Sequence, residues 1–186
     1  MPILAPQPTT FPEALFETST AEFSERRWSV LQTRSRQEKR TASSLHESGV
    51  PYFLPLIPKR LLIRGKTMQS YLPLFSGYVF LLGDHQDEQF ARATRRVARV
   101  IDVPDQVRLW QDLQQINQLI ASGVPIRPED QLVPGAPVEI RNGPLAGLRG
   151  VIVKSSTGNR FIVKVDFIQR GASVMLDECA LSRVFE

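Results

Sequence analysis

The hydrophobic pattern of this chain changes its period near residue 123, and no other feature restricts its possible folds as much. Before that point, helix-like stretches alternate with strand-like ones, and residues 109–120 place their apolar side chains on one helical face. After it, short runs of branched and aromatic residues alternate with turn sequences such as Asn142-Gly143-Pro144. This change predicts two domains of different architecture in one chain of 186 residues.

The first part predicts the element order strand, helix, three strands, helix, strand, helix. Its first helix begins at a capping box, in which Glu38 follows Ser35 by three residues. Residues 59–71 have the pattern of a hairpin, residues 74–82 that of a central strand, and residues 84–97 that of a helix. We therefore expect an α/β sandwich with a mostly antiparallel sheet and helices packed on it.

Composition predicts where the domains begin and end. Residues 1–27 are rich in proline and hydroxyl residues and lack periodicity, so we expect a disordered tail. Residues 28–122 form the predicted sandwich, and residues 123–133, with two prolines, form a flexible linker. Five short strands in residues 134–186 predict a small closed β-barrel. The expected fold class is α+β.

Charge is divided unevenly between these parts. The net charge is −4 for residues 1–25, +7 for residues 26–121 and +1 for residues 122–186. A basic domain attracts polyanions, of which the phosphate backbone is the commonest. On charge alone, a solvated arginine-rich surface explains the pattern equally well. One further hypothesis is that the acidic tail folds over the basic face and inhibits it.

The chain offers no constellation for catalysis. His46 and His85 lack partners at metal-ligand spacing, and Cys179 is the only cysteine. There is no glycine-rich phosphate loop and no nucleophile motif. We therefore expect a binding protein rather than an enzyme, without metal or cofactor. With no long apolar run and no basic secretory start, we expect a cytoplasmic monomer that does not contact a membrane.

Two segments together resemble the NusG family of transcription elongation factors. Residues 73–80 read Pro-Leu-Phe-Ser-Gly-Tyr-Val-Phe and resemble the family's Phe-Pro-Gly-Tyr-Val signature, with Ser76 in place of the usual proline. Residues 135–151 resemble a KOW motif, a glycine-containing turn between strands of a small barrel. The resemblance runs from about Trp28 to the end of the chain. It implies a NusG-type N-terminal domain followed by a KOW domain.

Within the family, the chain is most similar to the specialised paralogues RfaH and UpxY. Residues 64–75 resemble the RfaH hairpin, and residues 52–56 and 143–148 resemble UpxY. The resemblance implies an operon-specific antitermination factor that docks on the clamp helices of RNA polymerase and suppresses pausing and termination. Phe75 and Tyr78 match the docking aromatics, and Phe80 lies on the same strand face as Tyr78. For Phe80, a plain core role is an equally good interpretation.

The resemblance also implies contact with the non-template DNA strand. Arg34 and Arg95 match positions that touch DNA in RfaH-like proteins. A helix over residues 84–97 and beyond would align four arginines at i, i+3, i+4 and i+7 spacing. The predicted DNA-binding residues are Arg34, Arg36, Lys39, Arg92, Arg95, Arg96 and Arg99. The histidine that aids base reading in RfaH falls at Ser44, so the DNA sequence read should differ. The loop that contacts the gate loop of the polymerase falls at residues 87–89, which departs from the family's threonine-rich pattern for this second polymerase contact.

For the KOW domain, the resemblance implies contact with the ribosome or with Rho through Ile168, Gln169 and Arg170. The alternation of Val and Ile favours a stable barrel over the refolding known for RfaH. Two alternatives stay open, a housekeeping NusG and a KOW-containing protein that binds the ribosome or RNA. The charge division counts against the last, because the basic residues concentrate in the first domain.

Overall fold

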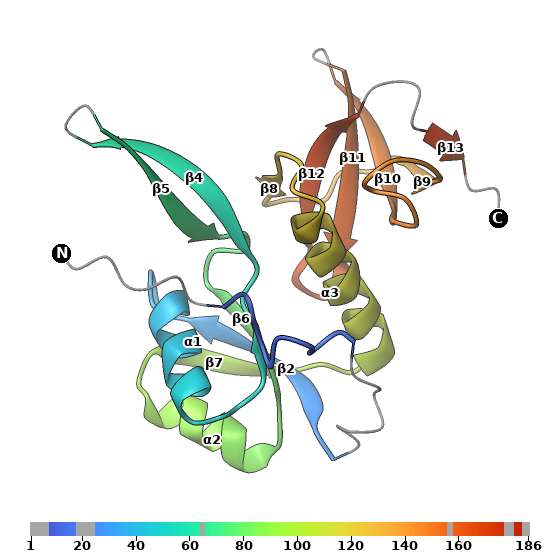
Figure 1. Ribbon diagram of the computed structural model, residues 1–186. Coiled ribbons are helices and arrows are strands. Elements are labelled where there is room, and N and C mark those ends of the chain that lie inside the picture. Colours follow the sequence, from blue (N-terminus) through green and yellow to red (C-terminus); the bar gives the residue numbers. More distant parts are fainter. Residues whose placement is uncertain (1–7, 18–24, 64–65, 156–157, 177–180, 184–186) are drawn as a thin grey trace. The chain divides into compact units, whose positions relative to one another are not determined.

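A computed structural model describes residues 8–17, 25–63, 66–155, 158–176 and 181–183 (Figure 1). The chain divides into two compact units, residues 1–106 and 107–186. No described helix is long and apolar enough to cross a membrane.

The first unit contains a five-stranded antiparallel sheet with the strand order β1-β3-β6-β2-β7. Its central strand is the apolar β6, in which Phe80 pairs with Phe53 on one side and with Val30 on the other. The mostly antiparallel sheet expected from the sequence is therefore present. The strands are β1 (Thr10–Phe11), β2 (Arg27–Thr33), β3 (Tyr52–Phe53), β6 (Tyr78–Gly83) and β7 (Val97–Asp102).

Two helices, α1 (Glu38–Glu47) and α2 (His85–Ala93), share one hydrophobic core with this sheet. Leu45 of α1 and Ala91 of α2 are buried in the same cluster as Leu81 of β6, so both helices cover the same face. A helix buries one apolar stripe in this way while its other side faces water.

The capping box predicted at the start of α1 is wrong. The N-cap residue is Gln37, and no side chain caps the helix there. The structure shows a capping box at α2 instead, where the Asp84 carboxylate accepts hydrogen bonds from the N–H groups of Gln86 and Asp87. The Asp87 carboxylate accepts one from the N–H of Asp84 at 3.1 Å. Asp is as good an N-cap as Ser, so the motif at α2 was readable from the sequence.

The segment before residue 28 differs from the disordered tail expected there. Residues 8–17 are ordered, with β1 paired to β3 and Leu15 fully buried. Composition failed here because a few well-placed apolar side chains can anchor a short segment that has no periodicity of its own.

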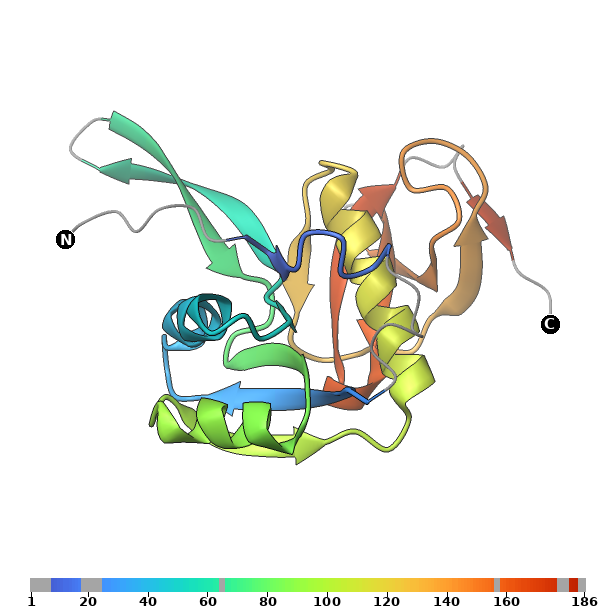
Figure 2. The same ribbon diagram turned by 60° about the horizontal axis from the view of Figure 1, so that its bottom comes forward.

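The predicted hairpin is present as a separate two-stranded sheet, β4 (Leu56–Ile63) and β5 (Lys66–Pro73). Its turn falls on residues 64–65, outside the described part. Figures 1 and 2 both show the hairpin extending away from the five-stranded sheet. The predicted strand over residues 74–82 begins only at Tyr78, because a turn precedes it, in which the Tyr78 N–H donates to the Phe75 carbonyl at 3.2 Å.

The second unit contains a six-stranded antiparallel sheet with the order β13-β9-β10-β11-β12-β8. The sheet is open: β13 and β8 are its two edges and do not pair with each other in the described residues. The expected closed five-stranded barrel is therefore not what the strand pairing shows. Its strands are β8 (Arg127–Glu129), β9 (Ala136–Ile140), β10 (Arg149–Ser155), β11 (Gly158–Val165), β12 (Arg170–Leu176) and β13 (Leu181–Arg183).

Two further features of this unit depart from the predicted boundaries. Strand β8 lies inside the predicted linker, and its Pro128 pairs with Ala172 of β12. Helix α3 (Gln106–Ala121), which the sequence assigned to the first domain, falls in the second unit apart from Gln106. Its apolar side is buried as its spacing predicts, with Leu113 and Ile116 fully covered.

Candidate interaction surfaces

The turn before β6 carries the predicted docking aromatics, and one backbone conformation and two hydrogen bonds fix its shape. Gly77 has a φ of +85°, a backbone conformation that residues with a side chain rarely adopt. Its carbonyl accepts from the Thr33 N–H at 2.8 Å, and its N–H donates to the Glu38 carboxylate at 2.7 Å. The turn is thereby connected to β2 and to the first residue of α1.

The aromatic side chains predicted to dock are largely covered in this structure. Phe75 and Phe80 are only 1% and 0% exposed, whereas Tyr78 is half-buried. The Phe75 ring meets the Phe80 ring edge-on with 6.2 Å between the ring centroids, and the centroids of Phe53 and Phe80 are 6.1 Å apart. We use the name aromatic face for Trp28, Phe53, Phe75 and Phe80, which gather on the side of the sheet opposite α1 and α2.

The predicted arginine stripe on one helix is wrong, because α2 ends at Ala93. The Thr94 hydroxyl donates to the Ala91 carbonyl at 2.7 Å, and Arg95 takes a left-handed φ of 60°. Arg96 follows in the connecting turn, and Arg99 lies in β7. Sequence spacing alone gave no sign that the helix stops there.

The fold nevertheless brings several of these arginines together. The Arg34 N–H donates to the Arg96 carbonyl at 2.8 Å, and Gln32 pairs with Arg99 across β2 and β7. The loop after β2, the end of α2 and the edge strand β7 therefore meet. Arg92 is exposed in the last turn of α2, Arg36 is exposed, and Lys39 is half-buried at the start of α1.

This basic surface, formed by Arg34, Arg36, Arg92, Arg95 and Arg99, is uncompensated. Within the described residues, none of the five forms an ion pair with a carboxylate. Arg96 is different, because its guanidinium donates to the Ser44 hydroxyl at 2.6 Å. Exposed cations without acidic partners are suited to hold a phosphate chain.

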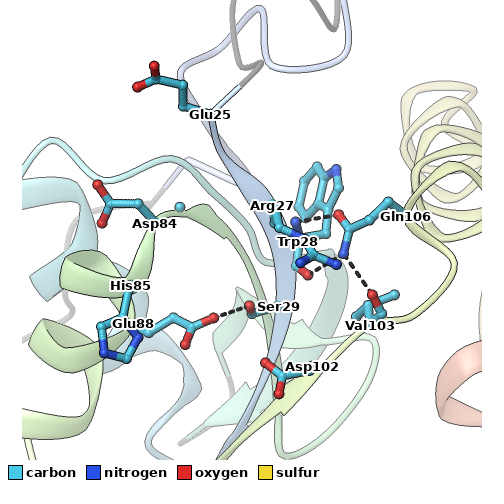
Figure 3. A pocket seen from close by; sticks show the side chains of 11 residues that line it. Glu25, Arg27, Trp28, Ser29, Asp84, His85, Glu88, Asp102, Val103 and Gln106 are labelled. Atoms are coloured by element: carbon cyan, nitrogen blue, oxygen red, sulfur yellow. Dashed lines mark hydrogen bonds between the residues drawn. The ribbon is translucent and has the colours of Figure 1, made fainter.

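Sequence reasoning missed a pocket of about 290 Å³ in the first unit (Figure 3). Carboxylates from separate segments line it, namely Glu25, Asp84, Glu88 and Asp102. The Ser29 hydroxyl donates to Glu88, and Gln106 bonds both backbone groups of Trp28 at 2.6 and 2.9 Å. Among the described residues, no three side chains of His, Cys, Asp or Glu are placed so that they could hold a metal ion together. No sequence signal could have found this pocket, because its carboxylates share no motif.

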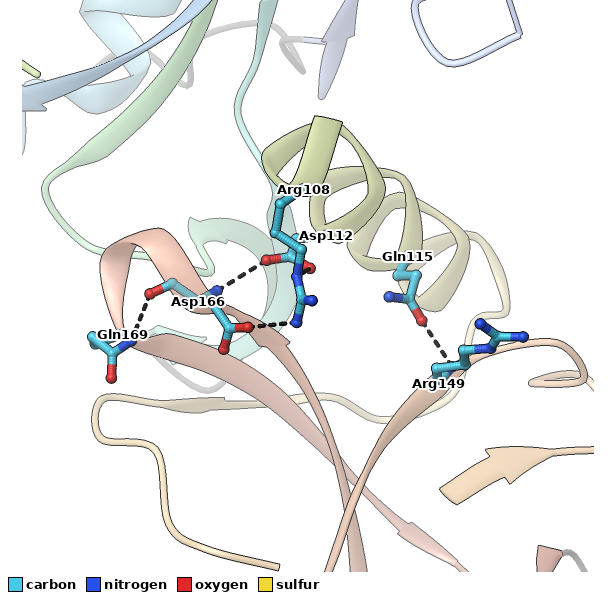
Figure 4. Close-up of polar contacts among 6 residues, drawn as sticks. All are labelled: Arg108, Asp112, Gln115, Arg149, Asp166 and Gln169. Atoms are coloured by element: carbon cyan, nitrogen blue, oxygen red, sulfur yellow. Dashed lines mark hydrogen bonds and ion pairs between the residues drawn. The ribbon is translucent and has the colours of Figure 1, made fainter. Parts of the chain in front are cut away.

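In the second unit, the loop predicted to bind partners is tied to α3 (Figure 4). A short 3-10 turn, Asp166–Ile168, leads to Gln169 in a left-handed conformation with a φ of 52°. The Asp112 carboxylate accepts from the Asp166 N–H at 3.0 Å, and Arg108 pairs with Asp166 at 2.5 Å. Burial raises the pKa of the Asp112 carboxyl, and the bond from Asp166 and the charge of Arg108 oppose that effect.

The three predicted residues of this loop have different environments. Ile168 is half-buried, Gln169 is exposed, and Arg170 pairs with Asp130 at 3.0 Å. A second attachment of α3 lies nearby in the same unit, where Gln115 accepts from the Arg149 N–H at 2.7 Å. The loop is therefore held in place by helix α3.

Comparison with known proteins identifies the family. Residues 26–122 match the family model described as transcription termination factor nusG, which covers more than half of the chain, and the chain belongs to the NusG family. It is a transcription factor of the NusG kind, from a family of transcription factors rather than enzymes, whose members bind RNA polymerase.

The fold is similar to a solved structure described as "Domain interaction in Thermotoga maritima NusG". The TM-score is 0.51 at 18% sequence identity, and the match covers 88% of this chain and 99% of the other. A search among curated proteins found no match.

Proposed function

We propose that this protein is an operon-specific elongation and antitermination factor of the RfaH or UpxY kind. It docks on the clamp helices of RNA polymerase, contacts the non-template DNA strand, and suppresses pausing and termination. The observation that carries the proposal is the uncompensated basic surface in the domain that matches the family model. Such a surface has a phosphate chain as its natural partner.

Docking is assigned to Phe75, Tyr78 and Phe80. The rings of Phe75 and Phe80 meet on the aromatic face, and the Tyr78 N–H donates to the Phe75 carbonyl in the turn beside them. A helix tip that enters an apolar depression needs such anchors. Tyr78 is the most accessible of the three. Because Phe75 and Phe80 are buried, docking requires that some of their present cover moves.

DNA binding is assigned to the basic surface together with Lys39 and Arg96. Arg34 contributes an exposed guanidinium from the loop after β2 and Arg99 one from β7, while Arg92 lies in the last turn of α2 and Arg95 just after it. Guanidiniums of this kind position the backbone by phosphate contacts and carry little sequence information. The Ser44 hydroxyl accepts a hydrogen bond from the Arg96 guanidinium at 2.6 Å.

For the second unit, we propose a KOW domain that binds the ribosome or Rho through Ile168, Gln169 and Arg170. We further propose that the protein acts as a cytoplasmic monomer, with functional domains at residues 28–122 and 134–186. The family description names a termination factor, so a general NusG-like role is the second candidate. Transcription of several unrelated templates separates the two, because an operon-specific factor acts on few of them.

The test is capture of purified RNA polymerase core by the immobilised protein. Tyr78→Ala and the double variant Phe75→Ala/Tyr78→Ala should lose binding, while Tyr71→Ala on the hairpin should keep it. Thermal melts establish that each variant is folded. If the wild-type protein does not retain polymerase, or if Tyr78→Ala and the folded double variant retain it as well as the wild type does, docking through these aromatics is wrong.

A further inference from the structure

We propose that residues 8–17 form a displaceable strap on the aromatic face, and that this strap competes with RNA polymerase for that face. The proposal rests on the docking function proposed above and adds an intramolecular occupant to it. The strap lies outside the family match, which begins at residue 26. It is therefore an addition to the family domain rather than one of its parts.

The strap is attached to the sheet by few backbone contacts. Strand β1 is two residues long and pairs Thr10 with Phe53 and Phe11 with Tyr52. The Thr9 carbonyl accepts from the Leu54 N–H at 2.7 Å. The Tyr52 hydroxyl donates to the Pro8 carbonyl at 3.2 Å, which completes this attachment.

The strap continues from this attachment to the aromatic face. Phe11 lies on the helix side, where its ring meets His46 edge-on at 4.5 Å and stacks on Tyr52 at 6.3 Å. A turn follows, in which the Leu15 N–H donates to the Pro12 carbonyl at 3.0 Å. Phe16 then meets Phe53 edge-on at 5.0 Å.

Phe16 occupies part of the aromatic face itself. Its ring stacks on Trp28 at 6.2 Å while its edge contact with Phe53 joins it to the chain of rings that continues through Phe80 to Phe75. Leu15 beside it is fully buried. A helix that docks on this face needs the same apolar surface, so strap and helix exclude each other where they overlap.

The strap is suited to leave because its attachment is limited. The two residue pairs of β1 with β3 at the sheet edge, and the rings of Phe11 and Phe16, hold the strap in place. The conformational entropy that its ten residues regain on release favours the opposite state. The strap is also acidic and exposed at Glu13 and Glu17. Ordered in this way, the segment lowers the fraction of molecules that present the face, and the apparent affinity falls by the same factor.

This placement differs from the hypothesis that the acidic tail covers the basic face. Strand β1 forms one edge of the sheet and β7, which carries Arg99, forms the other. Strand β1 therefore lies at the edge away from β7, and Phe16 reaches only Trp28 near the start of β2, whereas Arg34 follows the other end of that strand. Residues 18–24, with Glu22, lie outside the described residues.

The experiment measures binding of RNA polymerase core to the full chain and to two strap variants. Leu15→Ala/Phe16→Ala removes the two strap side chains buried at the aromatic face, and deletion of residues 1–25 removes the strap. Both variants should bind about fivefold more tightly or better, as expected when a masked fraction becomes available. Glu13→Gln, an exposed change in the same segment, is the matched control and should bind like the wild type.

A second readout reports the strap without polymerase. In a Trp110→Phe background, Trp28 is the remaining tryptophan and is 4% exposed beneath Phe16. Loss of the strap should shift its emission to longer wavelength and increase quenching by acrylamide, while circular dichroism shows that the sheet persists.

Each outcome decides between the proposals. Tighter binding by both folded strap variants supports the strap. Equal or weaker binding, with polymerase still captured, overturns the strap and leaves the docking proposal intact. If no variant and no wild-type protein binds polymerase, the docking proposal fails and competition at that face fails with it.

Discussion

The Glu38 carboxylate accepts a hydrogen bond of 2.7 Å from the backbone N–H of Gly77. This bond joins the first residue of α1 to the turn that carries Phe75 and Tyr78, although the two partners are 39 residues apart. Glu38 is buried, so its carboxylate belongs to the support of the proposed docking turn rather than to the solvated surface.

Glu38→Ala should lower the free energy of unfolding by about 1–3 kcal/mol, because it leaves the Gly77 N–H in a half-buried place without its acceptor. Glu38→Gln keeps an acceptor oxygen and should lose less. Urea unfolding measures both, with Glu47→Ala, an exposed change in the same helix, as control. Equal stability of Glu38→Ala and wild type would show that the bond contributes nothing.

DNA affinity should depend on salt through the basic surface. Arg34→Ala and Arg99→Ala should each weaken binding of single-stranded DNA regardless of its sequence, and each should reduce the slope of log K against log salt by about 0.7. Fluorescence anisotropy over a salt series measures this. Arg141→Ala, an exposed arginine of the second unit, should leave the slope unchanged. An unchanged slope in the first two variants would remove these residues from the interface.

Asp112 should give the second unit a distinctive pH dependence. In the unfolded chain its carboxyl loses a proton near the usual pKa of 3.8, whereas in the folded chain burial raises that pKa. The protonated carboxyl therefore contributes its whole stabilisation below pH 3.8, and this contribution to the free energy of unfolding is lost as pH rises through the raised pKa. Asp112→Asn keeps an acceptor for the Asp166 N–H and should remove this part of the profile.

Denaturation of wild type and Asp112→Asn between pH 3 and 7 measures that difference, with Asp102→Asn, an exposed residue, as the comparison. Two parallel profiles for wild type and Asp112→Asn would contradict the prediction.

Tyr52 should ionise only at strongly alkaline pH, because burial raises its pKa to about 12 from 10.0. Its contribution to stability is complete below pH 10 and is lost as pH rises from 10 to about 12. Absorbance at alkaline pH follows the three tyrosines of the chain. The late phase should vanish in Tyr52→Phe and persist in Tyr71→Phe, a change at an exposed ring.

The sequence predicted the regular parts of this fold well. The apolar spacing of residues 109–120 identified α3, and the alternating stretches identified most strands. Such patterns report burial on one face of a regular element, which is a local property. They do not report which sheet a helix accompanies, and α3 falls mostly in the second unit rather than in the first.

The departures have separate physical causes. Helix α2 ends at Ala93 because Thr94 closes it, so the arginine spacing has no helical meaning beyond that point. The sequence does not distinguish a phenylalanine that faces a partner from one in a core. In this structure Phe75 and Phe80 are buried. The ordered segment around Phe16 depends on contacts with residues distant in sequence, and these leave no local pattern.

The two-residue strand β1 has a consequence beyond docking. It covers the outer edge of β3, whose unpaired N–H and C=O groups would otherwise offer a template for another chain. A molecule that has released its strap exposes that edge together with apolar rings, which favours self-association. Because β3 itself is only two residues long, the exposed edge is a short template. The tendency of the strap-released protein to aggregate therefore stays small before it binds polymerase.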